Sequence, residues 1–171
     1  RRQSLLVAGQ AKGELIMTME IKKIAVATDF SKAADQALRY GLTFASQFGA
    51  ELHLVHVIED IIPTVPEPGL AMLPTQEIMQ TLRKSSEEAM AQQIARIPAG
   101  KINLVKVVRE GVPFREVDTY AREAEIDLLV LGTHGRTGLS HLLLGSVAER
   151  VLRSAPCPVL TVHLHERDFV K

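Results

Sequence analysis

The sequence has little of several features that would place a protein in a specialised class. It contains one cysteine, Cys157, so an intrachain disulfide is excluded, and 171 residues bury enough apolar surface without one. Its 20 basic and 20 acidic residues cancel, which leaves no basic field for a nucleic-acid backbone or an anionic bilayer. No run approaches the roughly 18 apolar residues of a membrane span. These absences predict a soluble cytoplasmic protein that binds neither nucleic acid nor membrane.

Two common nucleotide-binding fingerprints are also missing. Gly100-Lys101 is followed by Ile102, so the chain lacks the P-loop lysine pattern, and it contains no Gly-x-Gly of the dinucleotide-binding type. A GTPase-like or NAD-dependent protein is therefore disfavoured.

The composition, 46% hydrophobic and 23% charged, is typical of one globular domain. Met17 and Met19 directly precede the first strong strand pattern. We therefore expect residues 1–18 to be a leader, non-native or flexible, and residues 19–171 to form the domain.

Short apolar runs alternate with stretches of helical period, which is the pattern of parallel strands joined by crossover helices. This alternation predicts an α/β fold: a single open, doubly wound, parallel five-stranded sheet with helices on both faces, of the flavodoxin or Rossmann type. The predicted strands are 23–28, 52–58, 102–109, 127–131 and 157–162. The predicted helices are about 32–48, 75–96, 113–124 and 146–154.

Local signals set the ends of the predicted helices. Ser31 is placed to cap the first helix and Gly49 to end it. In the second helix one face is predicted from helical spacing, and its members are Met79, Leu82, Ala89, Gln93 and Ile94. Ligands of doubly wound sheets bind beyond the carboxyl ends of the strands, so we expect Thr28-Asp29, Val57-Ile58 and the loop after Leu131 to lie close together.

The segment from Gly132 to Val147 follows the most apolar predicted strand and leads into the last predicted helix. Glycine there lets backbone N–H groups approach an oxyanion, and the helix N-terminus adds a partial positive charge of about half a unit. Such a segment favours phosphate. Ser146 would either donate its hydroxyl to a phosphate oxygen or cap the helix.

The glycines of this segment are spaced as Gly132, two residues, Gly135, nine residues, then Gly145-Ser146. This spacing resembles the ATP-binding subgroup of the universal stress protein family. The resemblance also covers the segments 24–29, 54–57 and 154–162, and so extends over nearly the whole chain after Met19.

The resemblance implies an ATP site, with Mg²⁺ accompanying the nucleotide. Thr28 and Asp29 are similar to the residues that edge the adenine and ribose pocket, and Val57 is similar to the adenine-side contact. Gly132 is similar to the ribose-side glycine, and Arg136 is the nearest cation to the phosphates. The full implied set is Ala27, Thr28, Asp29, Val57, Gly132, Thr133, His134, Gly135, Arg136, Gly145, Ser146 and Val147.

The leading hypothesis is a stress-responsive regulatory module that binds ATP without being an enzyme. A slow adenine-nucleotide hydrolase stays open as an alternative, with only Asp29 and His134 as candidate general bases. An interaction protein with an empty pocket is the third reading, and the intact glycine spacing opposes it. Asp29 would in the simplest case only cap the first helix, and Cys157 is interpreted as a buried small residue.

The last predicted strand is apolar and uncharged, and as the final strand it is expected at a sheet edge. Members of the family that it resembles commonly pair this strand with its two-fold mate. A homodimer through the last strand is therefore expected.

Overall fold

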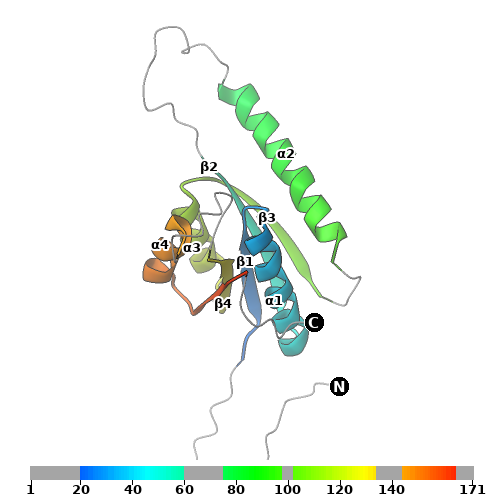
Figure 1. The fold of residues 1–171 in the computed structure, drawn as a ribbon, viewed down its shortest axis with the longest axis vertical. Helices are drawn as coiled ribbons and strands as arrows, with labels where there is room; N and C mark the ends of the chain where they lie inside the picture. Colours follow the sequence, from blue (N-terminus) through cyan, green and yellow to red (C-terminus); the bar gives the residue numbers. More distant parts are fainter. Residues whose placement is uncertain (1–19, 60–74, 98–101, 134–143, 165–171) are drawn as a thin grey trace, which may run out of the picture.

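The computed structural model describes residues 20–59, 75–97, 102–133 and 144–164. Strands and helices alternate strictly along this part of the chain (Figure 1). The strands are β1 (Lys23–Thr28), β2 (Glu51–Glu59), β3 (Leu104–Gly111), β4 (Leu128–Gly132) and β5 (Val159–Val162). The helices are α1 (Lys32–Phe48), α2 (Thr75–Ala95), α3 (Pro113–Glu123) and α4 (Ser146–Ser154).

All strand pairs of the sheet are parallel, and the strand order is β3-β2-β1-β4-β5. From β1 the chain winds outward to β3 on one side, then returns to place β4 and β5 on the other side. The predicted fold class is confirmed. The order reverses between β1 and β4, and at such a switch point the loops beyond the strand ends separate and leave a crevice.

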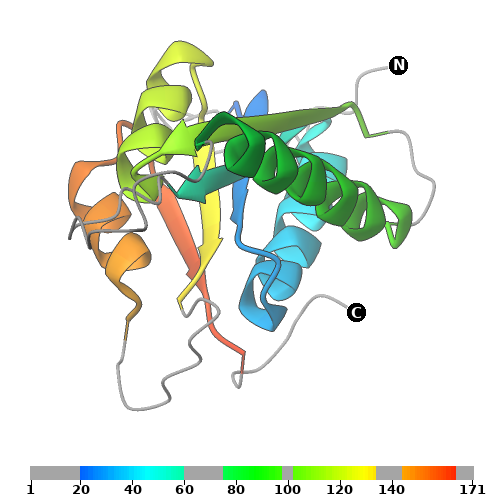
Figure 2. The same ribbon diagram turned by 90° about the horizontal axis from the view of Figure 1, so that it is seen from above.

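Helices cover both faces of the sheet, as Figure 2 shows from above. α1 and α2 contribute to one apolar cluster, in which Val26, Leu52 and Leu54 are fully buried strand residues. α3 and α4 pack on the other face over Ala25 and Leu129. Neighbouring strand residues thus point to opposite layers, as the period of two in a strand requires.

No helix in the described ranges combines the length and the apolar character needed to cross a membrane.

The ends of α1 are as predicted. The Ser31 hydroxyl accepts a hydrogen bond from the Ala34 amide at 3.2 Å, which satisfies one of the open N–H groups of the first turn. Gly49 ends the helix in the left-handed conformation.

The predicted strand 102–109 is displaced along the chain, since β3 spans Leu104–Gly111. Gly111 lies outside the predicted strand, which ends at residue 109. In the structure it pairs with Glu59 of β2, and this ladder contact keeps it in the strand. α3 then begins at Pro113, which suits a first helical position because its missing N–H has no partner there.

Candidate functional site

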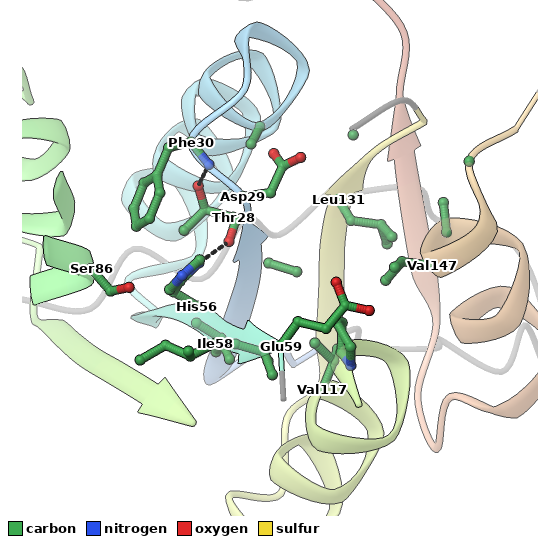
Figure 3. A pocket seen from close by; sticks show the side chains of 18 of the residues that line it. Thr28, Asp29, Phe30, His56, Ile58, Glu59, Ser86, Val117, Leu131 and Val147 are labelled. Atoms are coloured by element: carbon green, nitrogen blue, oxygen red, sulfur yellow. Dashed lines mark hydrogen bonds between the residues drawn. The ribbon is translucent and has the colours of Figure 1, made fainter. Parts of the chain in front are cut away.

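A cavity of about 780 Å³ opens at the carboxyl ends of β1, β2 and β4 (Figure 3). Its walls come from the turn after β1, the ends of β2 and β4, one side of α2, and the beginnings of α3 and α4. This is the crevice expected at the switch point of the sheet. The volume lies within the range of small-molecule and cofactor sites.

The predicted neighbourhood of strand ends is present, because residues of β1, β2 and β4 line this one cavity. Nine of the twelve residues implied by the resemblance are among its lining: Ala27, Thr28, Asp29, Val57, Gly132, Thr133, Gly145, Ser146 and Val147. The other three, His134, Gly135 and Arg136, lie outside the described residues.

The turn after β1 is held by its own side chains. Asp29 Oδ1 accepts a hydrogen bond from the Ser31 amide at 3.0 Å, and Thr28 Oγ1 accepts one from the Phe30 amide at 3.0 Å. Phe30 has a φ of 64°, in the left-handed region that side chains with a Cβ disfavour. Asp29 therefore helps to build the turn before α1 as well as lining the cavity.

His56 is a cavity residue that the sequence did not single out. It is 5% exposed, its Nδ1 lies 2.8 Å from the Thr28 carbonyl oxygen, and its ring centre lies 4.3 Å from that of Phe30. The register of the parallel pair β1–β2 would have identified it, because this register places His56 next to Thr28, a residue predicted to lie at the site. Without that register, a histidine in an apolar strand reads only as a residue on one strand face.

β4 and α4 meet at a compact corner of the cavity. The Gly145 amide donates to the Thr133 carbonyl at 2.7 Å, and the Thr133 amide donates to the Val162 carbonyl at 3.0 Å. A Cβ at Gly132 would come within 2.8 Å of the Ala33 backbone, so a glycine is needed there for the close approach of α1.

Ser146 is the first residue of α4, and Gly145 is its N-cap, with no side-chain capping bond. Ser146 therefore does not cap this helix, which was one of the two roles expected for it. Its side chain is exposed and lines the cavity next to the open N–H groups of the first turn. Backbone amides and a helix N-terminus at this corner favour an anionic group such as phosphate.

Two carboxylates, Asp29 and Glu59, face the cavity from the ends of β1 and β2 (Figure 3). No lysine or arginine is among the described lining residues. A carboxylate accepts hydrogen bonds from ligand hydroxyl or amino groups, as in the recognition of a ribose. The cavity thus combines acceptors at the β1–β2 end with N–H donors at the α4 end.

Two helices contribute walls that the sequence did not assign to a site: α3, through Pro113 and Val117, and α2. The α2 wall is the larger of the two in number of lining residues. The lining residues of α2 are Leu82, Ser85, Ser86 and Ala89. Two of them, Leu82 and Ala89, belong to the helix face that helical spacing predicted. The spacing indicated which face turns inward, but the period carries no information on whether that face meets a core or a cavity.

Cys157 has the environment of a structural cysteine. It is partly buried and packs against the cluster under α3 and α4. Burial raises the pKa of its thiol, and the nearby carboxylates of Asp127 and Asp118 raise it further. A thiol held protonated in this way is a poor nucleophile.

Comparisons with known proteins point to one family. The sequence profile described as the Universal stress protein family matches residues 20–163. A universal stress protein of Methanocaldococcus jannaschii, MJ0531, is 36% identical over 147 residues, which cover 86% of this chain and 85% of that protein. The structure of the universal stress protein UspA from Lactobacillus plantarum superposes with a TM-score of 0.72 at 28% identity, over 85% of this chain and 99% of that one. A universal stress protein solved in complex with cAMP is similar with a TM-score of 0.55 at 25% identity, over 85% and 98% of the two chains.

Proposed function

The chain belongs to the universal stress protein family, and from this premise we propose that it binds ATP in the cavity and acts as a stress-responsive regulatory module. The observation that carries the proposal is the shape of the site, in which the first turn of α4 and the ends of β1 and β2 line one cavity. The structure of a similar protein in complex with cAMP supports an adenine nucleotide as the ligand class.

The two ends of the cavity suit the two ends of a nucleotide. Val57 and His56 offer apolar and aromatic surface for a base, and the Asp29 carboxylate is an acceptor for ribose hydroxyls. The phosphates would then extend to the first turn of α4 at Ser146 and Val147, next to Gly145, whose own amide already donates to Thr133. In this proposal, the residues implied by the family resemblance keep the nucleotide-binding roles that the resemblance gives them. This includes His134, Gly135 and Arg136.

Mg²⁺ fits the site as a companion of the phosphates rather than as a resident metal of the protein. No group of three or more potential ligands among His, Cys, Asp and Glu is present in the described ranges. Mg²⁺ usually keeps several waters and binds through phosphates and one or two carboxylates. The charge of Mg²⁺ on the phosphates would offset the repulsion between the nucleotide and the two cavity carboxylates, Asp29 and Glu59.

Calorimetric titration with ATP and Mg²⁺ tests the site through Gly145→Val. Gly145 has a φ of −69° and a ψ of 153°, and α3 already begins after a valine of similar geometry, Val112. The backbone therefore accepts valine, while its side chain would block the approach of phosphate to the amides. We expect at least a tenfold loss of affinity, about 1.4 kcal/mol. Unchanged affinity for ATP would exclude this position for the phosphates.

The control variant is Ser46→Val, which lies exposed on α1 and outside the cavity. It should bind ATP as the parent protein does, and both variants should keep the parent melting temperature. Mass analysis of the nucleotide released from freshly purified protein identifies the ligand independently.

We also propose that turnover is slow or absent and that binding is the function. The chain has the phosphate-binding glycines without the P-loop lysine pattern, and Asp29 and His134 are the candidates it offers for a base that activates water. We expect a steady-state rate well below the ordinary enzyme range of about 1–10³ s⁻¹. A rate within that range, abolished by Asp29→Ala or His134→Ala, would instead favour the hydrolase alternative.

The proposed assembly is a homodimer through β5, in the cytoplasm. β5 has β4 on one side and ends the described sheet on the other. Its open edge suits pairing with the same strand of a second copy about a two-fold axis.

A further inference from the structure

A buried glutamine of α2, Gln93, joins three elements at the carboxyl end of the sheet. It is 5% exposed and lies outside the cavity lining. Its Nε2 donates to Asp35 Oδ1 of α1 at 2.7 Å, and its Oε1 accepts from Thr28 Oγ1 of β1 at 3.1 Å. The nitrogen and the oxygen of the Gln93 side chain are therefore both hydrogen-bonded to groups from other elements.

The bond to Gln93 sets the direction of the Thr28 hydroxyl. A hydroxyl carries one proton, and here it points to Gln93 Oε1. The lone pairs are then directed to the Phe30 amide, which donates to Thr28 Oγ1 at 3.0 Å. Gln93 thus orients a group that holds the turn after β1.

That turn needs to be held. Phe30 has a φ of 64°, and a residue with a Cβ persists in this region only where its surroundings fix it. The surroundings include the bond to Thr28 and the His56 ring, whose centre is 4.3 Å from that of Phe30. Asp29 and Phe30 both line the cavity, so the position of this turn shapes the site.

We infer that Gln93 is a positioning residue for nucleotide binding, and that it couples the docking of α2 to occupancy of the cavity. The inference rests on the proposed function. Residues of α2, among them Leu82 and Ser86, form a cavity wall, so the contact that seats α2 also completes the site. Coupling of this kind is reciprocal: a docked α2 favours the nucleotide, and the nucleotide favours a docked α2 to the same extent.

The first test compares Gln93→Leu with Gln92→Leu, whose parent side chain is the exposed neighbour on the same helix. Calorimetry with ATP and Mg²⁺ should show a loss of affinity of about three- to tenfold for Gln93→Leu and none for Gln92→Leu. Hydrogen exchange supplies the second readout. ATP should slow exchange of the α2 amides in the parent protein and in Gln92→Leu, but much less in Gln93→Leu.

A second pair of variants changes Asp35, the partner of Gln93 on α1, and leaves the buried glutamine itself unchanged. Asp35→Asn keeps an oxygen that accepts from Gln93 Nε2, whereas Asp35→Ala removes the acceptor. Both variants lose the same charge in the first turn of α1. We expect weaker ATP binding for Asp35→Ala and near-parental binding for Asp35→Asn. This pair decides the question if Gln93→Leu fails to fold.

Failure of the inference is distinct from failure of the proposed function. If the parent protein binds ATP while Gln93→Leu and Asp35→Ala bind it with parental affinity and parental protection of α2, Gln93 is only structural and the inference is overturned. A lower melting temperature with unchanged affinity has the same meaning. If the parent protein binds no nucleotide, the proposed function fails and the inference fails with it.

Discussion

His53 is buried beneath α3, at the end of the sheet opposite the cavity. It is 5% exposed, and its Nδ1 lies 2.6 Å from the Tyr120 hydroxyl. The carboxylate of Glu51 comes within 2.8 Å of Nε2, without the alignment of a hydrogen bond. Burial lowers the pKa of His53 below its usual 6.5, an effect that Glu51 opposes and the Lys23 charge reinforces. Burial also raises the pKa of Tyr120, which stays protonated.

The lowered pKa of His53 predicts a pH-dependent stability. The unfolded chain takes up this proton near pH 6.5, and the folded chain takes it up only at lower pH. The contribution to the free energy of unfolding is therefore complete above pH 6.5 and is lost as the pH falls from 6.5 through the folded pKa. Urea unfolding between pH 7.5 and 5.5 should show a slope of up to about 1.4 kcal/mol per pH unit from this group.

His53→Gln should remove that part of the slope while keeping a partner for Tyr120. His163→Gln, in a partly exposed position after β5, is the control and should retain it. Equal slopes for His53→Gln and the parent protein would show that His53 does not titrate differently on folding.

The sequence predicted the residues whose role depends on neighbouring positions in the chain. It did not predict the roles of residues that depend on contacts with distant positions. The cap of Ser31 and the cavity position of Thr28 follow from strand and helix ends, and both are found in the structure. His56 and Gln93 acquire their roles from partners far along the chain, as the bond from Thr28 to Gln93 illustrates. Apolar periodicity identifies which side of an element is inner, and it carries no information on such partners.

At the scale of elements, α1 lies unusually close to β1. A Cβ built on Gly41 would lie 2.3 Å from Val26 Cγ2, well inside contact distance. In an exposed helix, alanine is favoured over glycine by up to about 1 kcal/mol. Here the overlap should outweigh propensity, so we expect Gly41→Ala to lower the free energy of unfolding by about 1–3 kcal/mol.

A double-mutant cycle identifies the cause of that loss. Val26→Ala removes the methyl that the new Cβ would meet, so the double variant should be more stable than the sum of the two single effects predicts. Additive effects in urea unfolding would mean that the strain arises at another contact, such as that with Leu52 Cδ1, which the new Cβ would approach to 3.3 Å.

The ends of helices and strands were predictable where capping residues mark them. They were less predictable where pairing with a neighbouring strand sets the end. α1 ends at its predicted glycine, whereas β3 continues to Gly111 because β2 offers Glu59 as a partner. The inner face of α2 was predicted, but its position over the cavity depends on how α2 meets the sheet. That geometry is set by contacts across the fold rather than by the sequence of the helix.

At the scale of the whole molecule, the two edges of the sheet differ in charge. β3 carries Lys106, Arg109 and Glu110, and charged side chains oppose pairing with another strand. β5 contains no charged residue. The edge position predicted for the last strand is confirmed for the described sheet, and the uncharged edge is the one that the proposed dimer would use.

The backbone pattern of β5 supplies a test of the proposed dimer that leaves the core intact. The carbonyls of Pro158 and Val162 accept from amides on the β4 side, so in a parallel ladder the intervening Thr161 directs its backbone groups to the open edge. Thr161→Pro removes an outward N–H without removing a bond to β4, and proline is tolerated on edge strands. We expect sedimentation at micromolar concentration to show a dimer for the parent protein and for Thr161→Val, which keeps the N–H, and a weakened dimer for Thr161→Pro. A parent protein that sediments as a monomer, or a proline variant with unchanged dissociation, would exclude pairing through β5.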